Sequence, residues 1–314
     1  KNAHFSVFWP KSTEITEILL LGFQNLQNLR ILLFISILII YIISLAGNIV
    51  IITLISTLRR LHTPMYTFLG LLSSSEIIST TNIVPNMLVV IAADGSVMPF
   101  TACLSQFYIF SALTNTECFL LTMMSYDRYL AICHPLRYNS IMNSKLCLQL
   151  IIWSWVLVFF IITTGIILVC QLHFCGFNQI DHFLCDFGPI VALSTSDTSV
   201  ATMYDFMSSI PTISAPFIFI IGTYVHIFIT ILKMNSKTGR QKTFSTCSSH
   251  LTVVCTYYGT QMIVYMGPTG DNYANMKKFL SLLYVIITPF MNPIIYSLSN
   301  KEIRETLKKY IRLM

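Results

Sequence analysis

The chain has 314 residues, of which 54% are hydrophobic and only 10% are charged. Because a soluble globular domain carries about 25% charged residues, a chain with so few could not cover its own surface in water. The composition therefore excludes an ordinary soluble protein and indicates that lipid surrounds the chain. The net charge of +6 does not indicate a nucleic-acid-binding protein, because the basic residues are scattered over short segments between apolar runs.

Apolar runs that are long enough to cross a bilayer recur along the chain. A spanning helix needs about 20 mainly apolar residues. The expected spans are 31–57, 64–92, 100–126, 146–170, 200–232, 246–267 and 279–299. We therefore predict an all-α integral membrane protein whose seven-helix bundle occupies residues 31–299, after an extracellular N-terminal segment at 1–30.

The charged residues between the spans predict the orientation. Most Lys and Arg residues fall in the segments of one side, and acidic residues are more frequent on the other. Because cytoplasmic loops carry the excess of Lys and Arg, we expect the N-terminus outside the cell. The third span then ends in MSYDRYLAICHPLRY (124–138) at the cytoplasmic side, where Asp127 can hold Arg128. On composition alone this pair is interpreted more simply as a helix anchor than as a switch.

Several short motifs occur in a fixed order on these spans. They are Gly47-Asn48, LHTPMY (61–66), MSYDRYLAIC (124–133), Thr223-Tyr224, KTFSTCSSHL (242–251) and PFMNPIIYSLSNKEIR (289–304). With these motifs the chain resembles the vertebrate odorant receptors, a branch of the rhodopsin-like G-protein-coupled receptors, from about residue 14 to residue 312. Phe244 within KTFSTCSSHL is typical of the larger, tetrapod-type class.

The resemblance implies a function. An odorant receptor lies in the plasma membrane, contacts membrane lipid, and is not an enzyme. It binds small volatile organic molecules, mostly neutral, and activates a stimulatory, olfactory-type heterotrimeric G protein that raises cyclic AMP. A short cytoplasmic amphipathic helix is implied at 300–314. The resemblance also implies activation and coupling roles for Asp127, Arg128, Tyr129, Tyr224, His250, Asn292, Pro293 and Tyr296.

The resemblance places a ligand pocket in the outer half of the bundle, on the third, fifth, sixth and seventh spans. Its expected lining is Phe107, Phe110, Ser111, Thr114, Asn115, Ser208, Ser209, Thr212, Tyr258, Gln261, Met262, Tyr265, Ser281 and Val285. These side chains are aromatic, apolar or hydroxyl-bearing, and no charge is central. Such a lining suits a small neutral ligand. Plain packing between helices is the alternative for each position.

The cysteines indicate how the outer loop is held. In the resemblance Cys103 pairs with Cys185, and the oxidising outer side allows such a bond to persist. The family has a second pair within that loop, but the position expected for the partner of Cys175 is Leu193-Ser194-Thr195. Cys175 is then either free, which we expect, or paired with Cys170. A metal site formed by the His and Cys residues of 173–185 is a weaker interpretation of the same loop.

Two acidic residues lie in the middle of apolar spans. Ionisable side chains inside a bilayer are costly and are candidates for functional sites. Glu76 and Glu117, with Asn48, Ser125 and Asn292, could hold a sodium ion or share a proton. A hydrogen-bonded structural network with one or both acids neutral is the equal alternative. No other cofactor is expected.

Other classes of membrane protein fit the sequence less well. A transporter is disfavoured because the chain has no inverted repeat and no paired broken helices at the membrane centre. A ligand-gated channel of the insect odorant receptor type would have its N-terminus inside, against the charge distribution. An enzyme is disfavoured because the buried acids have no convincing nucleophile or metal cluster beside them.

Overall fold

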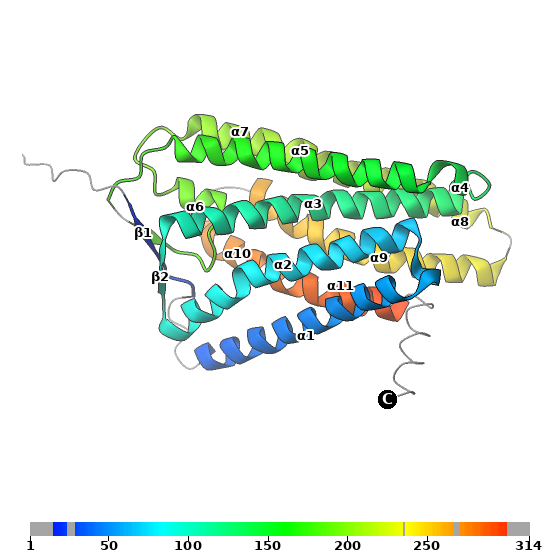
Figure 1. Cartoon of the computed structure of the whole chain (residues 1–314), viewed down its shortest axis with the longest axis horizontal. Helices are drawn as coiled ribbons and strands as arrows, with labels where there is room; N and C mark the ends of the chain where they lie inside the picture. The colour runs from blue at the N-terminus through cyan, green and yellow to red at the C-terminus, as the bar shows by residue number, and fades with distance from the viewer. Residues whose placement is uncertain (1–14, 24–28, 177, 235, 267–270, 300–314) are drawn as a thin grey trace, which may run out of the picture.

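The structure is a computed structural model that describes residues 15–23, 29–176, 178–234, 236–266 and 271–299. Long helices run along one direction and form a bundle with a small sheet at one end (Figure 1). Within the described residues the helices make seven passes: α1 (Leu29–Thr57), α2 (Pro64–Ala93), α3 (Phe100–Cys133), α5 (Ser144–Cys170), α7 with α8 (Ser199–Ser209, Ala215–Leu232), α9 (Lys237–Met266), and α10 with α11 (Asp271–Leu282, Thr288–Ser299). Residues 1–14 and the amphipathic helix expected at 300–314 lie outside the described residues.

The helices extend beyond the apolar runs that predicted them. α3 continues to Cys133 and so includes Asp127 and Arg128, whereas the apolar run ends at residue 126. α9 begins at Lys237 rather than at 246, and α10 begins at Asp271 rather than at 279. The reason is geometric: the 34 residues of α3 are about 51 Å long at 1.5 Å per residue, and the hydrocarbon core is about 30 Å thick. The apolar run therefore predicts the part of a helix that lies in the membrane, and it does not predict where the helix begins or ends.

Two passes contain a π-helical turn that hydropathy did not predict. The turn η2 (Ile210–Ser214) joins α7 to α8 and contains Pro211, and η3 (Leu283–Ile287) joins α10 to α11. A proline removes a backbone donor, and one-turn π segments are frequent at functional sites. These turns shift the side chains that follow them around the helix axis, which a regular 3.6-residue period does not anticipate.

The outer surface of the bundle is apolar. Five of the described passes are long and apolar enough to cross a membrane, namely Leu29–Thr57, Pro64–Ala93, Ser144–Cys170, Ser199–Leu232 and Met276–Tyr296. Trp153, Phe160 and Ile218 are each 69% exposed on this surface. Because α3 lies inside the bundle, most of its buried side chains face other helices. The exposed apolar rings and chains fit a protein that lipid surrounds.

A three-stranded sheet caps one end, although the sequence predicted only helices. Its strand order is β2 (Ser96–Pro99), β1 (Glu17–Leu20) and β3 (Gln179–Ile180). β1 is antiparallel to β2, with Glu17 opposite Pro99, and parallel to β3, with Leu20 opposite Ile180. Ile18, Leu20 and Ile180 are almost fully buried against the helix ends. The sheet thereby ties the N-terminal segment to two loops.

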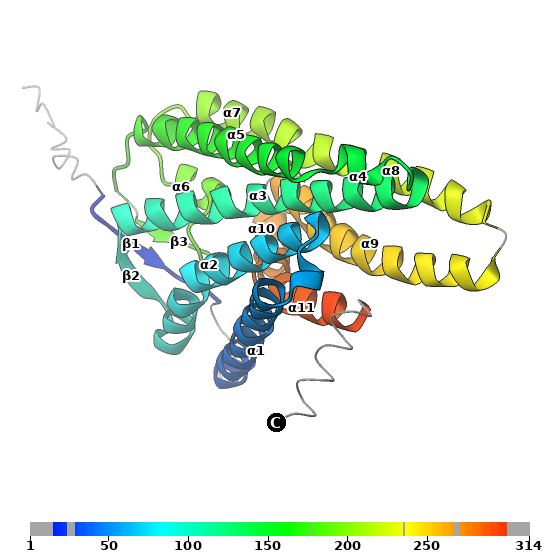
Figure 2. The same cartoon turned by 45° about the vertical axis from the view of Figure 1, so that its right-hand side comes forward.

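Short elements complete the fold. They are the 3-10 turn η1 (Arg59–Leu61), α4 (Tyr138–Ile141) and α6 (Phe187–Val191). α6 lies near the sheet, whereas α4 and the adjoining ends of α8 and α9 lie at the opposite end (Figure 2). We call these the sheet end and the α4 end. The apolar core between them is formed mainly by α2, α3, α8 and α9.

Candidate functional site

A cavity lies between the helices on the sheet side of the bundle. Side chains from α3, α5, α7, η2 and α9 line it, and α6 closes it from the loop. Its empty space is about 690 Å³, opening included. The expected ligand residues that it brings together are Phe107, Ser111, Thr114, Asn115, Ser208, Ser209, Thr212, Gln261 and Tyr265.

The other expected ligand residues do not line this cavity. Phe110 and Val285 are buried in a separate apolar cluster, in which Phe110 stacks on Tyr284 with ring centroids 5.8 Å apart. The hydroxyl of Tyr258 donates to the Cys118 carbonyl at 2.7 Å, and Met262 packs against the central core. Ser281 is 1% exposed. Val285 lies within the π-helical turn η3 and Ser281 lies just before it, and such a turn shifts side chains around the helix axis.

Sequence reasoning missed part of the cavity wall. The missed residues are Ile161, Ile162 and Gly165 of α5, Asp186 and Phe187 at α6, Tyr204 and Asp205 of α7, and Ile213 of η2. The α5 residues could not be placed because their position depends on the approach of α7, where the Tyr204 hydroxyl donates to the Ile161 carbonyl at 2.9 Å. Asp205 had a detectable signal, since it is an acid inside an apolar span. Because Asp205 lines the cavity, its wall contains an acidic side chain, whereas the expected lining had no central charge.

The loop before α7 is fixed over the bundle at several points. The expected Cys103–Cys185 disulfide is present and joins the start of α3 to the loop. The Cys185 backbone N–H also donates to Gln106 Oε1 at 3.0 Å. Lys278 of α10 donates to Asp181 Oδ1 at 2.5 Å and to the Gly22 carbonyl at 2.9 Å. The loop, the N-terminal segment and the last pass are therefore joined to one another.

Buried polar groups in this loop have shifted acidities. His182 is 7% exposed and accepts a hydrogen bond from the Leu184 N–H. Burial, together with the Lys278 charge, lowers the pKa of His182 to about 3. Burial raises the pKa of Asp186, against the opposing effect of hydrogen bonds from the Phe187 N–H and the Tyr265 hydroxyl. His182 is thus a neutral packing residue at neutral pH.

Cys175 was expected to be free rather than paired with Cys170, and this is confirmed. Both Cys175 and Cys170 are free. Where the second family disulfide is missing, hydrogen bonds join the same two segments: Thr195 N–H donates to the His173 carbonyl at 2.9 Å, and Phe174 pairs with Ser194 as a β-bridge. Among the described residues no group of three or more His, Cys, Asp or Glu side chains could hold a metal ion.

The α4 end contains the Asp-Arg-Tyr triplet. Asp127 is 1% exposed, and its Oδ2 lies 3.6 Å from the Arg128 guanidinium. The hydroxyl of Tyr138, on α4, donates to Asp127 Oδ1 at 2.7 Å, a contact that sequence reasoning missed. Tyr129 faces the loop instead, with its hydroxyl 3.0 Å from His134 Nε2. Asp127 is therefore held by two groups and in turn restrains Arg128.

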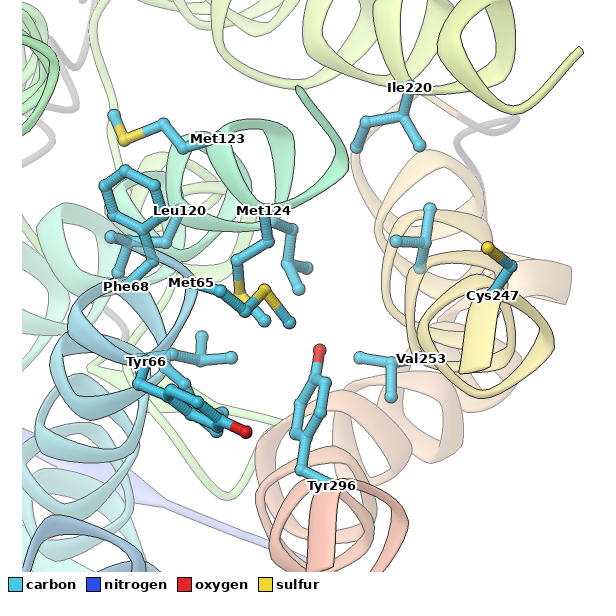
Figure 3. Packing of buried hydrophobic residues seen from close by; sticks show 14 of the residues in the cluster. Met65, Tyr66, Phe68, Leu120, Met123, Met124, Ile220, Cys247, Val253 and Tyr296 are labelled. Carbon is cyan, nitrogen blue, oxygen red and sulfur yellow. The ribbon is translucent and has the colours of Figure 1, made fainter. Parts of the chain in front are cut away.

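Aromatic residues of the other passes converge beside Arg128. The Tyr224 hydroxyl of α8 lies 2.5 Å from His250 Nδ1 of α9, with the two rings stacked. The Tyr296 ring lies 6.4 Å from that of His250, centroid to centroid. Figure 3 shows the Tyr296 hydroxyl between Met65 and Met124 on one side and Val253 on the other. That hydroxyl is buried and has no hydrogen-bond partner among the described residues. These side chains connect α8, α9 and α11 near Arg128.

A polar cluster lies in the middle of the bundle. Asn292 donates to Glu76 Oε1, and Asn48 donates to the Pro289 carbonyl at 3.3 Å. Glu117 Oε2 accepts from the Tyr257 hydroxyl at 2.9 Å. The remaining side-chain oxygens of the four predicted residues have no partner among the described residues: Asn48 Oδ1, Glu76 Oε2, Glu117 Oε1 and Asn292 Oδ1. Ser125 donates to the Thr122 carbonyl instead. Pro293 packs against Gly47.

Comparison with known proteins bears directly on this architecture. A family model described as olfactory receptor matches residues 37–313. Human olfactory receptor 11L1 is 44% identical over 307 residues, which cover 96% of this chain and 94% of that protein. Human olfactory receptor 11H6 is 44% identical over 301 residues, covering 95% and 91%. The crystal structure of squid rhodopsin matches with a TM-score of 0.69 at 19% identity, covering 91% of this chain and 86% of that chain.

These similarities agree with the geometry. The likeness to squid rhodopsin shows the rhodopsin-like seven-helix fold, and the human relatives show the family at nearly full length. The family, the spanning helices and the disulfide indicate a multi-pass plasma-membrane receptor that responds to an odorant ligand through a heterotrimeric G protein, and not an enzyme. The chain belongs to the olfactory receptor family of G-protein-coupled receptors.

Proposed function

We propose that this receptor binds small, volatile and mostly neutral organic molecules in the cavity between α3, α5, α7 and α9. Binding activates a stimulatory, olfactory-type heterotrimeric G protein and raises cyclic AMP. The observation that supports this most is the cavity: it is covered by a fixed loop and lined mainly by apolar, aromatic and hydroxyl side chains. Lining of this kind suits small organic ligands that are oriented by a few polar contacts.

The α3 helix connects this cavity to the proposed coupling site. Its Ser111 and Thr114 line the cavity, and its Asp127 and Arg128 lie at the α4 end. α9 also reaches both regions, through Gln261 at the cavity and His250 beside Tyr224. A ligand that binds one arrangement of these helices more tightly shifts the population toward it. Release of Arg128 toward the G protein is the proposed result.

Membrane lipid is the second proposed partner. The exposed apolar side chains of α1, α5 and α8 supply a surface for acyl chains. Basic residues gather toward the α4 end, including Arg59, Arg137 and Lys145. Each such charge near an anionic leaflet contributes about 1 kcal/mol of attraction. This supports an orientation in which the α4 end faces the cytoplasm.

A cavity-filling substitution tests the proposed ligand site. Ser111→Leu adds an apolar side chain inside the cavity, while Ser105→Leu makes the same change at an exposed position of the same helix. Cells that express each form with equal surface staining are exposed to a broad odorant panel, and cyclic AMP is measured. We expect Ser111→Leu to raise the half-maximal concentration of an activating odorant about tenfold or more, a loss of about 1.4 kcal/mol.

The same experiment contains the contradicting results. An equal loss of odorant potency in Ser111→Leu and Ser105→Leu would show that the cavity is not the ligand site. The proposed signalling would be contradicted if wild-type receptor reaches the cell surface but cyclic AMP does not change for any odorant of the panel. A rise in a different second messenger would contradict only the stimulatory G protein.

We also propose that the polar cluster holds a sodium ion. Oxygen atoms are the ligands that hard cations prefer, and unpartnered side-chain oxygens of Asn48, Glu76, Glu117 and Asn292 are available. Glu117 also acts electrostatically on Glu76, and two nearby buried carboxylates need a cation or a shared proton. The residues present therefore fit the ion, and a proton shared between the acids remains the alternative outcome.

Thermal unfolding distinguishes these two outcomes. We expect the melting temperature of the purified receptor to be higher in sodium chloride than in choline chloride at equal ionic strength, because an ion that binds only the folded state stabilises it. Glu76→Gln should remove the difference, and Glu17→Gln, at an exposed carboxylate in β1, should keep it. Identical melting in both salts would favour the shared proton.

A further inference from the structure

Two carboxylates border the ligand cavity from different elements. Asp205 lies on α7, and Asp186 is the N-cap residue of α6 in the covering loop. Asp186 is 5% exposed. Both side chains line the cavity, and Asp186 acts electrostatically on Asp205, so two carboxyl groups share one part of the wall. The cavity wall is therefore acidic on one side, although the rest of it is apolar or hydroxyl-bearing.

The two carboxylates differ in their hydrogen bonding. Asp186 Oδ1 accepts from the Phe187 N–H at 2.8 Å, and Oδ2 accepts from the Tyr265 hydroxyl at 3.1 Å. The Tyr265 hydroxyl lies 3.0 Å from that of Tyr284, which fixes its position. The side chain of Asp205, in contrast, has no hydrogen-bond or ion-pair partner in the part of the chain that the structure describes. Only its backbone carbonyl accepts a bond, from Ser208 at 2.9 Å.

In the part of the chain that the structure describes, little positive charge faces these two acids. Lys277 is the cation that acts on Asp186, whereas the electrostatic neighbour of Asp205 is Asp186 itself. Lys278 is occupied by Asp181 and the Gly22 carbonyl. Asp205 is half-buried, and a carboxylate that is partly removed from water without a cation or donor is costly. An ammonium group in the cavity would offset that cost.

A third polar group in the cavity wall is also unpartnered. Gln261 is fully buried and lines the cavity from α9. Its Oε1 accepts a weak bond from the Cys118 thiol at 3.5 Å, but its Nε2 has no partner among the described residues. A buried amide donor that lacks an acceptor costs about 1–3 kcal/mol. The donor therefore indicates a ligand atom that accepts a hydrogen bond.

We infer that the preferred ligand is a small organic amine that is protonated in water, with its ammonium at Asp205 and Asp186 and an acceptor atom at Gln261. Phe107, Phe187 and Tyr204 supply apolar and aromatic surface for its carbon chain. Such an amine is volatile as the free base, and like the lysine side chain it is protonated at neutral pH. This inference rests on the proposed function and narrows its ligand class: amines are neutral and volatile as free bases, and the cavity binds their protonated form.

The test compares matched ligand pairs on matched receptor variants. Each short-chain primary amine that carries an ether oxygen as acceptor is paired with the alcohol that has the same chain and ether oxygen, and cyclic AMP is recorded against concentration. The readout is the ratio of amine potency to alcohol potency, which cancels differences in expression. The variants are Asp205→Asn, which removes the charge, Asp205→Glu, which keeps it, and Asp197→Asn, which removes an exposed carboxylate that does not line the cavity.

We expect wild type to favour the amine, and Asp205→Asn to lower the potency ratio about tenfold or more. Asp205→Glu and Asp197→Asn should keep a ratio that favours the amine. The inference is overturned if wild type responds to alcohols or other odorants but not to amines, or if Asp205→Asn leaves the ratio unchanged. In those cases the proposed receptor function stands. Surface-expressed wild type that answers no odorant of any class would instead contradict the proposed function.

Discussion

At the scale of single residues, the loop histidine His182 shows how burial determines chemistry. Its sequence context, HFLCD at 182–186, left open a role as a metal ligand. In the structure its ring lies 4.6 Å from that of Phe183, tilted by 37°, and is buried beside Lys278 and Asp181, and Cys185 is in a disulfide. Because metal binding needs an accessible lone pair, the packing role is the better account of this residue.

The lowered pKa of His182 predicts a pH effect on stability. A histidine with a lowered folded pKa is neutral when folded, so the unfolded chain binds the extra proton. Its stabilisation is complete above the ordinary pKa of about 6.5 and is lost as the pH falls toward the folded value of about 3. Within this window the free energy of unfolding falls by up to about 1.4 kcal/mol per pH unit.

Melting temperatures between neutral and acid pH check this effect. His182→Gln should reduce the fall in melting temperature at acid pH, because glutamine keeps an acceptor for the Leu184 N–H and does not titrate. His173→Gln changes an exposed histidine of the same loop and should leave the loss as in wild type. An acid loss of the same size in His182→Gln would mean that a group other than His182 causes it, and would contradict this account.

At the scale of elements, the contact between α1 and α11 depends on a missing side chain. A Cβ placed on Gly47 would lie 2.8 Å from the Cβ of Pro293, closer than packed carbons approach. The proline ring cannot rotate away, so the helices would have to separate. Pro293 follows Asn292, which donates to Glu76, and a shift here would disturb the polar cluster as well.

We therefore expect Gly47→Ala to destabilise the receptor by about 1–3 kcal/mol, as overpacking does. Gly222→Ala provides the matched control, because a Cβ there meets nothing within 4 Å. Since alanine favours a helix over glycine, that control should be neutral or stabilising by up to about 1 kcal/mol. The melting temperatures of the two variants test this expectation. Equal stability of both would show that α1 and α11 adjust to the added Cβ without a loss of stability.

The elements also show what could be predicted from sequence and what could not. The spans follow from bilayer thickness, and so their positions were predicted closely from apolar runs such as the one at 31–57. The sheet was missed because β1 is only four residues and its partners Pro99 and Gln179 are distant in the chain. Four of the five α3 positions that the resemblance implied line the cavity and Phe110 does not, whereas Asp186 depends on a loop fold that has no period.

At the scale of the whole molecule, the two ends of the bundle have different tasks. The sheet, the disulfide and the Lys278–Asp181 ion pair immobilise one end around the cavity. Among the described residues, the side-chain contacts of the α4 end include Tyr138 with Asp127 and Tyr224 with His250, which can separate without breaking a covalent bond. A receptor needs this difference, because a ligand must bind a defined pocket while the far end changes conformation.

The central claim is that odorant binding acts on the G protein through Arg128. Its direct test is nucleotide exchange by a purified stimulatory G protein with the receptor in lipid nanodiscs, using an odorant already found to activate cells. Wild type should accelerate exchange when the odorant is added. Arg128→Ala should lose that acceleration while binding the odorant normally, and Arg137→Ala, at an exposed arginine of the neighbouring loop, should keep it. Odorant-stimulated exchange that persists undiminished in Arg128→Ala would contradict the account.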